Sequence, residues 1–321
     1  MGEYRVSVLL SAPEGTIVEV LAAGQAARAE VSRGGWQRLV VGVVELASDV
    51  RLNLSRADGA VNEVAVKSVE LEHVDDVEAR LARADLFRGA ACTEVERLRA
   101  SRLGLMFQYG PWSFGLDAER PGIDRHVDDF DVHSFVDRVV TLGAQHVVWS
   151  LSWYTYQLAS PLSSVLDITG DPSLVSKRDL IGEVAAALAE RGIQFFLYYH
   201  PGHDGHLTYG TTPWWRAQDW PEEFTKTGLG DREQFFENTR RVLEEAGEWH
   251  GETLSGWFLD DGLIYYPAPF EMLGRALRAG NDARLISYNS WIMPSFTDFE
   301  DVAFGEGLHS FDGIEVDARG S

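Results

Sequence analysis

From residue 103 onward, short apolar segments alternate with segments that have the spacing of amphipathic helices. Near-continuous apolar strands that alternate with helices indicate an α/β fold with a parallel sheet covered on both faces. The six or seven such units favour a (β/α)8 barrel, the TIM-barrel architecture, over an open sheet. The expected strands are 103–110, 146–152, 193–200, 254–261, 284–289 and 301–306, with 313–316 as a candidate seventh.

The region from 103 to 321 is short for such a barrel, which typically needs ~250 residues. We therefore expect the chain to be a segment of a longer protein, with a barrel that is truncated at its C-terminal end. A barrel without its last strands would leave an open cleft.

Helix signals lie between the expected strands. Asp131 is expected to cap a helix over 132–142. Ser176 with Asp179 resembles a capping box in front of a helix over 178–191. Further helices are expected over 231–249 and 269–279.

Residues 1–73 have a different texture, because apolar and polar residues alternate in short bursts between Gly, Ser, Asn and Asp. Alternation with period two indicates antiparallel strands in a β-sandwich or a small barrel. A complete sandwich usually has about seven strands or more, so this one is expected to be partial. The expected strands are 4–10, 16–21, 37–46, 50–54 and 64–71.

The expected domain order is a small β-sandwich-like domain over 1–73, a helical connector over 74–102 and the barrel domain over 103–321. The connector is expected to be helical because opposite charges lie three and four residues apart in it, a spacing that stabilises helices.

Composition excludes several classes of partner. The formal net charge is −22, from 28 basic and 50 acidic residues, which disfavours binding to nucleic acid or to an anionic membrane surface. No apolar run approaches the ~20 residues that span a bilayer. The single cysteine, Cys92, excludes an intrachain disulfide and a cysteine-based metal site. The N-terminus lacks a signal-peptide pattern, so we expect a cytoplasmic chain as given, or a secreted one if upstream sequence is missing.

The expected strand 254–261 ends in two adjacent carboxylates, Asp260 and Asp261, followed by Gly262. An Asp-Gly pair often begins a turn, and this interpretation is the simpler one for the dipeptide alone. Burying a carboxylate costs several kcal/mol unless it is hydrogen-bonded or paired. Barrel enzymes carry their chemistry at the C-terminal ends of the strands, so both aspartates are candidate catalytic residues.

The other expected strands also end in polar or aromatic residues. In a barrel these residues gather on one rim, which is the active face. Each residue alone could satisfy a loop or fill the core, but the repetition at every strand favours a site. The candidates are Gln108 and Trp112, then Trp153 and Tyr154, then His200 and His203, then Asn289 and Trp291, and finally Glu306 with His309 nearby.

Two chemistries fit this rim. Carboxylates beside aromatic side chains suit glycoside hydrolysis, in which one carboxylate acts as nucleophile or base and a second acts as acid, without a cofactor. A metal-dependent hydrolase is the alternative, but the His-x-x-His spacing at 200–203 contains Pro and Gly and is a weak signal, so neither metal nor cofactor is expected. A catalytically idle carbohydrate-binding protein is a further alternative if the barrel is incomplete. The metal alternative would use His200, His203, Asp204, Asp260, Asp261 and His309.

Several segments between about 103 and 310 resemble the α-L-fucosidase family of retaining glycoside hydrolases. Residues 105–113 resemble that family's first barrel strand, which carries a His-Trp-Gly-x-Tyr-Ser pattern, and 258–260 resemble the aromatic-x-Asp that carries its nucleophile. Further similar segments are 135–146, 177–183 with its Arg-Asp helix start, and 192–200 with Tyr-Tyr at its end.

The resemblance implies a retaining glycosidase acting on a carbohydrate, with Asp260 as nucleophile, Glu306 as candidate acid/base and Asp261 as a neighbour that orients Asp260 or holds a hydroxyl. Residues 4–72 are similar to part of a carbohydrate-binding β-sandwich. The expected sugar-binding residues are Trp112, Trp153, Tyr154 and Trp291 as walls, with Gln108, His200, His203 and Asn289 as hydrogen-bonding groups.

The chain departs from the family at two places. Gln108 stands where the family has a sugar-binding histidine on strand one, and Ser152 and Trp153 stand near its His-His pair after strand two. Those histidines hold the sugar hydroxyls. The resemblance therefore implies the fold and the nucleophile more strongly than it implies fucose as the sugar.

Overall fold

The computed structural model of the chain describes residues 2–22, 25–46, 53–56, 64–110, 122–153, 156–200, 233–260, 268–289 and 297–303. The described residues form two compact units. The first comprises residues up to 86 together with 297–298, and the second comprises the described part of 87–289 together with 299–303. The boundary falls within helix α1 (Val74–Ala90), and α2 (Cys92–Ala100) follows, so the segment expected to be helical is helical.

The first unit contains two antiparallel sheets of three strands each. This result confirms the antiparallel strands that period-two alternation predicted. One sheet has the order β4 (Gly35–Leu46), β1 (Gly2–Ala12), β6 (Ala65–His73), and the other has the order β3 (Gln25–Glu30), β2 (Ile17–Ala22), β5 (Asn53–Arg56).

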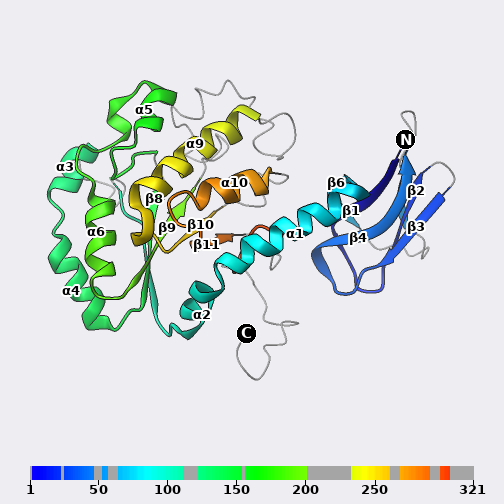
Figure 1. Cartoon of the computed structure of the whole chain (residues 1–321), viewed down its shortest axis with the longest axis horizontal. Coiled ribbons are helices and arrows are strands. Elements are labelled where there is room, and N and C mark those ends of the chain that lie inside the picture. The colour runs from blue at the N-terminus through cyan, green and yellow to red at the C-terminus, as the bar shows by residue number, and fades with distance from the viewer. Residues whose placement is uncertain are drawn as a thin grey trace. The chain divides into compact units, whose positions relative to one another are not determined.

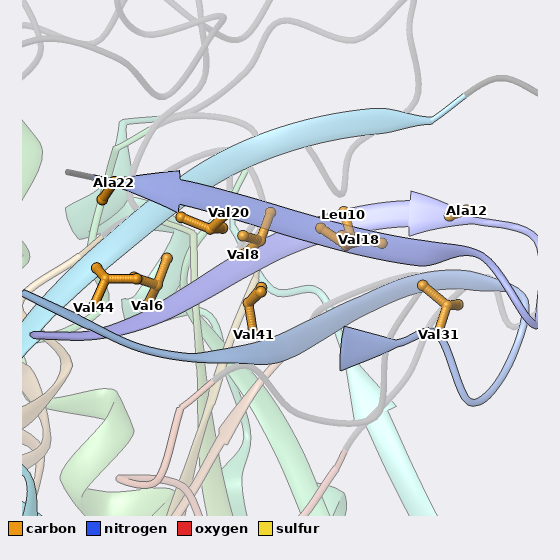
Figure 2. Packing of buried hydrophobic residues seen from close by; sticks show 10 residues of the cluster. All are labelled: Val6, Val8, Leu10, Ala12, Val18, Val20, Ala22, Val31, Val41 and Val44. Carbon is orange, nitrogen blue, oxygen red and sulfur yellow. The ribbon is translucent and has the colours of Figure 1, made fainter. Parts of the chain in front are cut away.

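The core of the first unit is made of alternate residues of its strands. Val6, Val8 and Leu10 of β1 and Val18 and Val20 of β2 are buried and lie together in one cluster (Figure 2). Successive strand side chains point to opposite faces, so every second residue of β1 from Val6 to Ala12 and of β2 from Val18 to Ala22 enters this cluster. Each buried valine or leucine contributes roughly 1.5–3 kcal/mol relative to an exposed one.

Strand β3 was not predicted from the sequence. Its sequence, Gln-Ala-Ala-Arg-Ala-Glu, has alanines where a strand usually has β-branched or aromatic residues. It forms a strand because it pairs along its whole length with β2, from Ile17 opposite Glu30 to Ala22 opposite Gln25.

The second unit contains a parallel sheet of five strands in chain order. The strand expected over 146–152 is confirmed at both ends, and the bounds of the other four are confirmed within three residues. Their order in the sheet is β11 (Leu285–Tyr288), β10 (Gly256–Leu259), β9 (Gln194–Tyr199), β8 (His146–Ser152), β7 (Gly104–Phe107).

Helices occupy the connections between these strands (Figure 1). They are α3 (Ile123–Asp128) and α4 (Val132–Leu142) after β7, α5 (Ser163–Thr169) and α6 (Leu180–Ala189) after β8, α9 (Glu233–His250) before β10, and α10 (Phe270–Leu277) before β11. Within the described residues, no helix is long and apolar enough to cross a membrane.

The two faces of the parallel sheet pack against different partners. One face, which we call the inner face, carries Val148, Phe196, Tyr198, Phe258 and Leu285. These residues form one buried cluster with residues of α2 and with the residue before α2. The opposite, outer face of the sheet is apolar and lies on the side of the connecting helices. One contact on that side is the indole N–H of Trp257, which donates to the carbonyl of Leu277 in α10 at 2.9 Å.

Two helix boundaries test the capping predictions. Asp131 caps α4, because its carboxylate accepts from the backbone N–H of Ser134 at 3.0 Å, as predicted. The Ser176 prediction was wrong. Asp179 caps α6 by accepting from Gly182 N at 3.0 Å, whereas the hydroxyl of Ser176 donates to the carbonyl of Arg178. The short helices α3 and α5 were not predicted.

The predicted sixth strand, 301–306, is wrong over its described part, because 301–303 are not a strand. The Asp301 carboxylate instead accepts two hydrogen bonds from the guanidinium of Arg278, at 2.8 and 2.9 Å, and one from Ile286 N at 2.8 Å. Residues 304–306 and the candidate strand 313–316 lie outside the described residues.

The guanidinium of Arg284 is fully buried at the start of β11. Burial lowers the pKa of this group to about 10, which still leaves it charged at neutral pH. The helical Gly247 is needed beside it, since a Cβ there would lie 2.7 Å from Nη1 of Arg284. The guanidinium donates to five carbonyl oxygens, those of Gly247, Gly251, Leu254, Leu277 and Ala279, at 2.6–3.0 Å.

We expect Arg284→Met to lower the free energy of unfolding by about 3 kcal/mol or more, because it leaves several buried carbonyl oxygens without donors. Arg275→Met is the matched control, since Arg275 is exposed and makes an i,i+4 ion pair with Glu271, worth about 0.3–0.5 kcal/mol. Urea unfolding of both variants measures the difference. Equal losses of stability would contradict the role given to Arg284.

Stability should also depend on pH through buried histidines. Burial lowers the pKa of His126, His146 and His250 below its usual value of 6.5. Between the lowered and the usual pKa, the unfolded chain binds more protons than the folded one, so the free energy of unfolding falls as pH falls through this range. We expect a lower Tm at about pH 5.5 than at about pH 7.5, and a smaller difference in His146→Gln. A Tm that is equal at the two pH values would refute this.

Candidate active site

Three neighbouring strands bring Asp260, His200 and Asn289 to one level of the sheet. Leu259 of β10 is paired with Tyr199 of β9 and with Tyr288 of β11, so the next residue of each strand lies in the following row. The ladder continues into that row, because Asp260 N donates to Tyr199 O at 3.0 Å and Asn289 N donates to Leu259 O at 2.7 Å.

Asp260 is the carboxylate of this row. Only 7% of Asp260 is exposed, and Asn289 is fully buried. Asn289 Nδ2 donates to Asp260 Oδ1 at 2.7 Å, and the hydroxyl of Tyr198 donates to Asp260 Oδ2. A buried carboxylate needs such donors, and hydrogen bonds to an ionised acceptor are stronger than neutral ones. Each oxygen of Asp260 is therefore held by a neutral donor from an adjacent strand.

Tyr198 is a site residue that the sequence analysis missed. It lies on β9, two residues before His200, so both side chains are on the inner face, with Tyr198 two rows deeper. Its ring packs beside Phe258, with the ring centroids 5.5 Å apart. A tyrosine inside the run Phe-Phe-Leu-Tyr-Tyr is easily interpreted as core, and the i, i+2 spacing to His200 was the available signal.

His200 is buried beside the end of β8, with 4% of its surface exposed. The hydroxyl of Ser152 donates to His200 O at 2.7 Å and accepts from His200 N at 3.2 Å. The pairing of β8 with β9 shifts by one residue between Ser150 and Ser152. At the site, the hydroxyl of Ser152 therefore makes the hydrogen bonds to the His200 backbone in place of a backbone partner. The His200 ring centroid lies 6.4 Å from that of Tyr198.

Gln108 lies two rows below Asp260. Phe107 is paired with Trp149, which puts the following residue, Gln108, level with Ser150, and Ser150 is paired with Tyr198. The hydroxyl of Ser150 accepts from Tyr109 N at 2.7 Å and donates to Tyr109 O at 3.0 Å. Ser150 thus holds the end of β7 in the same way as Ser152 holds the end of β9.

Trp153 is half-buried and packs against the inner-face cluster that contains Val148, Tyr198 and Phe258. The structure therefore places five predicted site residues, Gln108, Trp153, His200, Asp260 and Asn289, on or next to the inner face at the strand ends. Of these, Asp260 and Asn289 are in direct contact.

The remaining predicted site residues lie outside the described residues, so the spacing between Asp260 and Glu306 stays a prediction. In the part of the chain that the structure describes, no three His, Cys, Asp or Glu side chains are grouped so that they could hold a metal ion. The residues outside are Trp112, Tyr154, His203, Asp261, Trp291 and Glu306, together with Asp204 and His309 of the metal alternative.

No protein-family model matches the chain, and no curated protein matches it. Among solved structures, it is similar to the unliganded α-L-fucosidase AlfC from Lactobacillus casei, with 17% identity, coverage of 60% of this chain and 68% of that one, and a TM-score of 0.43. It is also similar to the endo-fucoidan hydrolases MfFcnA9 and MfFcnA4 of glycoside hydrolase family 107, each with 17% identity. Coverage is 67% and 65% of this chain, and TM-scores are 0.48 and 0.47.

The chain spans 44% of the length of MfFcnA9 and 37% of that of MfFcnA4.

The two serine contacts give a matched pair of predictions. We expect Ser152→Ala to speed hydrogen exchange of the His200 amide roughly fivefold, the effect of losing a hydrogen bond worth about 1 kcal/mol. Ser150→Ala should do the same for the Tyr109 amide and leave His200 unchanged. Native-state exchange followed by NMR measures both amides. Equal effects of either variant on both amides would refute local contacts of this kind.

Proposed function

We propose that the chain is a glycoside hydrolase that resembles the α-L-fucosidases and cleaves a terminal sugar by a retaining, two-carboxylate mechanism, with Asp260 as nucleophile. The observation that carries this proposal is the buried carboxylate at the C-terminal end of β10, held on both oxygens by donors from β9 and β11. The sequence resemblance supports the same residue independently.

The competing explanation for Asp260 is a turn residue in front of Gly262. An aspartate that only begins a turn keeps its carboxylate near water and bonds to the local backbone. Asp260 is instead buried, and its partners Tyr198 and Asn289 come from neighbouring strands. Burying a carboxylate costs several kcal/mol without such donors, and its place at a strand end supports a catalytic role.

The strand order supports a barrel as the proposed architecture. In doubly wound sheets the strand order reverses at a switch point, whereas in a (β/α)8 barrel the strands follow one another in chain order. The five strands from β7 to β11 follow chain order without reversal. We propose a (β/α)8 barrel domain over 103–321, after a connector over 74–102 and a carbohydrate-binding-module-like domain over 1–73.

The proposed reaction has two steps. An oxygen of Asp260 attacks the anomeric carbon while the glycosidic C–O bond breaks, and Glu306 gives its proton to the leaving oxygen. Glu306 then takes a proton from water, whose oxygen attacks the anomeric carbon and releases Asp260. The carboxyl groups of a retaining pair lie about 5–5.5 Å apart, and about 6.5–9.5 Å would indicate inversion.

The other predicted residues have proposed roles in holding the sugar. Asp261 orients Asp260 or binds a hydroxyl. Aromatic faces suit the apolar C–H side of a sugar, and polar side chains suit its hydroxyls. The proposed walls are Trp112, Trp153, Tyr154 and Trp291, and the proposed hydrogen-bonding groups are Gln108, His200, His203 and Asn289.

The test is hydrolysis of a panel of aryl α- and β-glycosides, starting with an aryl α-L-fucoside, by the wild-type chain, Asp260→Ala and Asp261→Ala. We expect Asp260→Ala to lower kcat about 10⁴-fold or more, the scale of losing a covalent nucleophile. Asp261→Ala, the adjacent control, should retain much more activity. Circular dichroism checks that each variant is folded.

Azide separates the two carboxylate roles. With Asp260→Ala, azide occupies the place of the missing nucleophile and should give a glycosyl azide of inverted anomeric configuration, whereas Glu306→Ala should give the retained azide. Equal activity of Asp260→Ala and the wild type would refute the nucleophile assignment. A folded wild-type chain that binds sugars and hydrolyses none of the panel would favour the idle carbohydrate-binding protein.

A further inference from the structure

We propose that Tyr198 is a positioning residue, which fixes the carboxylate of Asp260 in the orientation for attack. The hydroxyl of Tyr198 donates to Asp260 Oδ2, and it reaches that oxygen from two rows below, on the neighbouring strand β9. This inference rests on the proposed role of Asp260 as nucleophile.

A carboxylate is easily misdirected, because the terminal torsion of an aspartate has a broad, roughly two-fold profile. A single donor would leave the group free to turn about that contact. Here Asn289 Nδ2 holds Oδ1 at 2.7 Å and Tyr198 holds Oδ2, and the two donors come from strands on opposite sides of β10. Together they fix the plane of the Asp260 carboxylate.

The donor itself is rigid. Tyr198 is 2% exposed, and its ring lies in the inner-face cluster with Val148, Phe196 and Phe258. A tyrosine has only two side-chain torsions, and a ring packed on all sides in a strand cannot swing as a loop residue can. The phenol is therefore built into the sheet and presents its hydroxyl at one place.

The chemistry of a phenol suits this role. It donates a hydrogen bond to the carboxylate and adds no charge of its own at neutral pH. The same bond stabilises the carboxylate when it leaves in the second step. Misplacing a reacting group by about 1 Å can cost about 10²-fold in rate, so losing one of two fixed donors should reduce kcat.

Tyr199 provides a matched control within the same strand. It is the next residue, it is fully buried, and its side chain is on the outer face, where its hydroxyl lies 3.0 Å from the hydroxyl of Tyr156. Tyr199→Phe therefore removes the same atom at the same depth without touching Asp260.

The first test compares Tyr198→Phe with Tyr199→Phe on the glycoside that the wild type hydrolyses. We expect Tyr198→Phe to lower kcat about 10²-fold with little change in KM, and Tyr199→Phe to leave both constants near wild type. A purely structural role of the phenol would change stability and leave the ratio of kcat to KM unaltered. Equal kinetic constants for the two variants would overturn the proposal.

The second test does not depend on activity. Urea unfolding midpoints are measured for the wild type, Tyr198→Phe, Asp260→Ala and the double variant. We expect Tyr198→Phe to lower the midpoint in the wild-type background and to lower it much less when Asp260 is absent, because the hydrogen bond has then already been lost.

The outcomes separate the two proposals. Equal midpoint losses in the two backgrounds would overturn the positioning role of Tyr198 while leaving Asp260 as a candidate nucleophile. The midpoint loss could be smaller in the Asp260→Ala background while the wild-type chain hydrolyses no glycoside. That combination would overturn the proposed function, and with it the catalytic purpose given to Tyr198.

Discussion

The buried guanidinium of Arg284 is the contact on which the arrangement of the candidate site depends. It binds carbonyl oxygens from the C-terminal ends of α9 and α10 and from the segment that leads into β10, and it stands itself at the start of β11. Helix C-termini carry partial negative charge, so they compensate a buried cation without a carboxylate. The two strands that begin near this cation, β10 and β11, are four residues long and are followed by Asp260 and Asn289.

Because β10 and β11 are short, the guanidinium of Arg284 that fixes the start of each strand also fixes the position of its end. Asp260 and Asn289 each follow a four-residue strand whose register with its neighbours is uninterrupted. The contact between their side chains at 2.7 Å is therefore set by backbone pairing and needs no flexible loop. A site built on strands in this way holds its groups more precisely than a site on loops.

Much of this architecture could be predicted from the sequence. Apolar runs identified the five parallel strands, and strand topology predicted that Asp260, His200 and Asn289 lie at one edge. Their detailed contacts could not be predicted, because side chains such as Tyr198 look like core residues until their partner is known. Arg284 escaped notice for the same reason, since its acceptors are backbone carbonyls of other elements, which leave no pattern in the sequence.

The polar contacts of β9 also bear on the register of this strand in the sheet. Its sequence, Gln-Phe-Phe-Leu-Tyr-Tyr, is buried on both faces, so a slip by one residue would still bury aromatic and aliphatic side chains on each side. Hydrophobic burial alone therefore specifies the register of this strand only weakly. The choice falls to the polar contacts of Gln194 with Glu94 and of Tyr198 with Asp260, and to the Ser152 hydroxyl on the backbone of His200. The groups that make the site thus also select which of two nearly equivalent alignments the strand adopts.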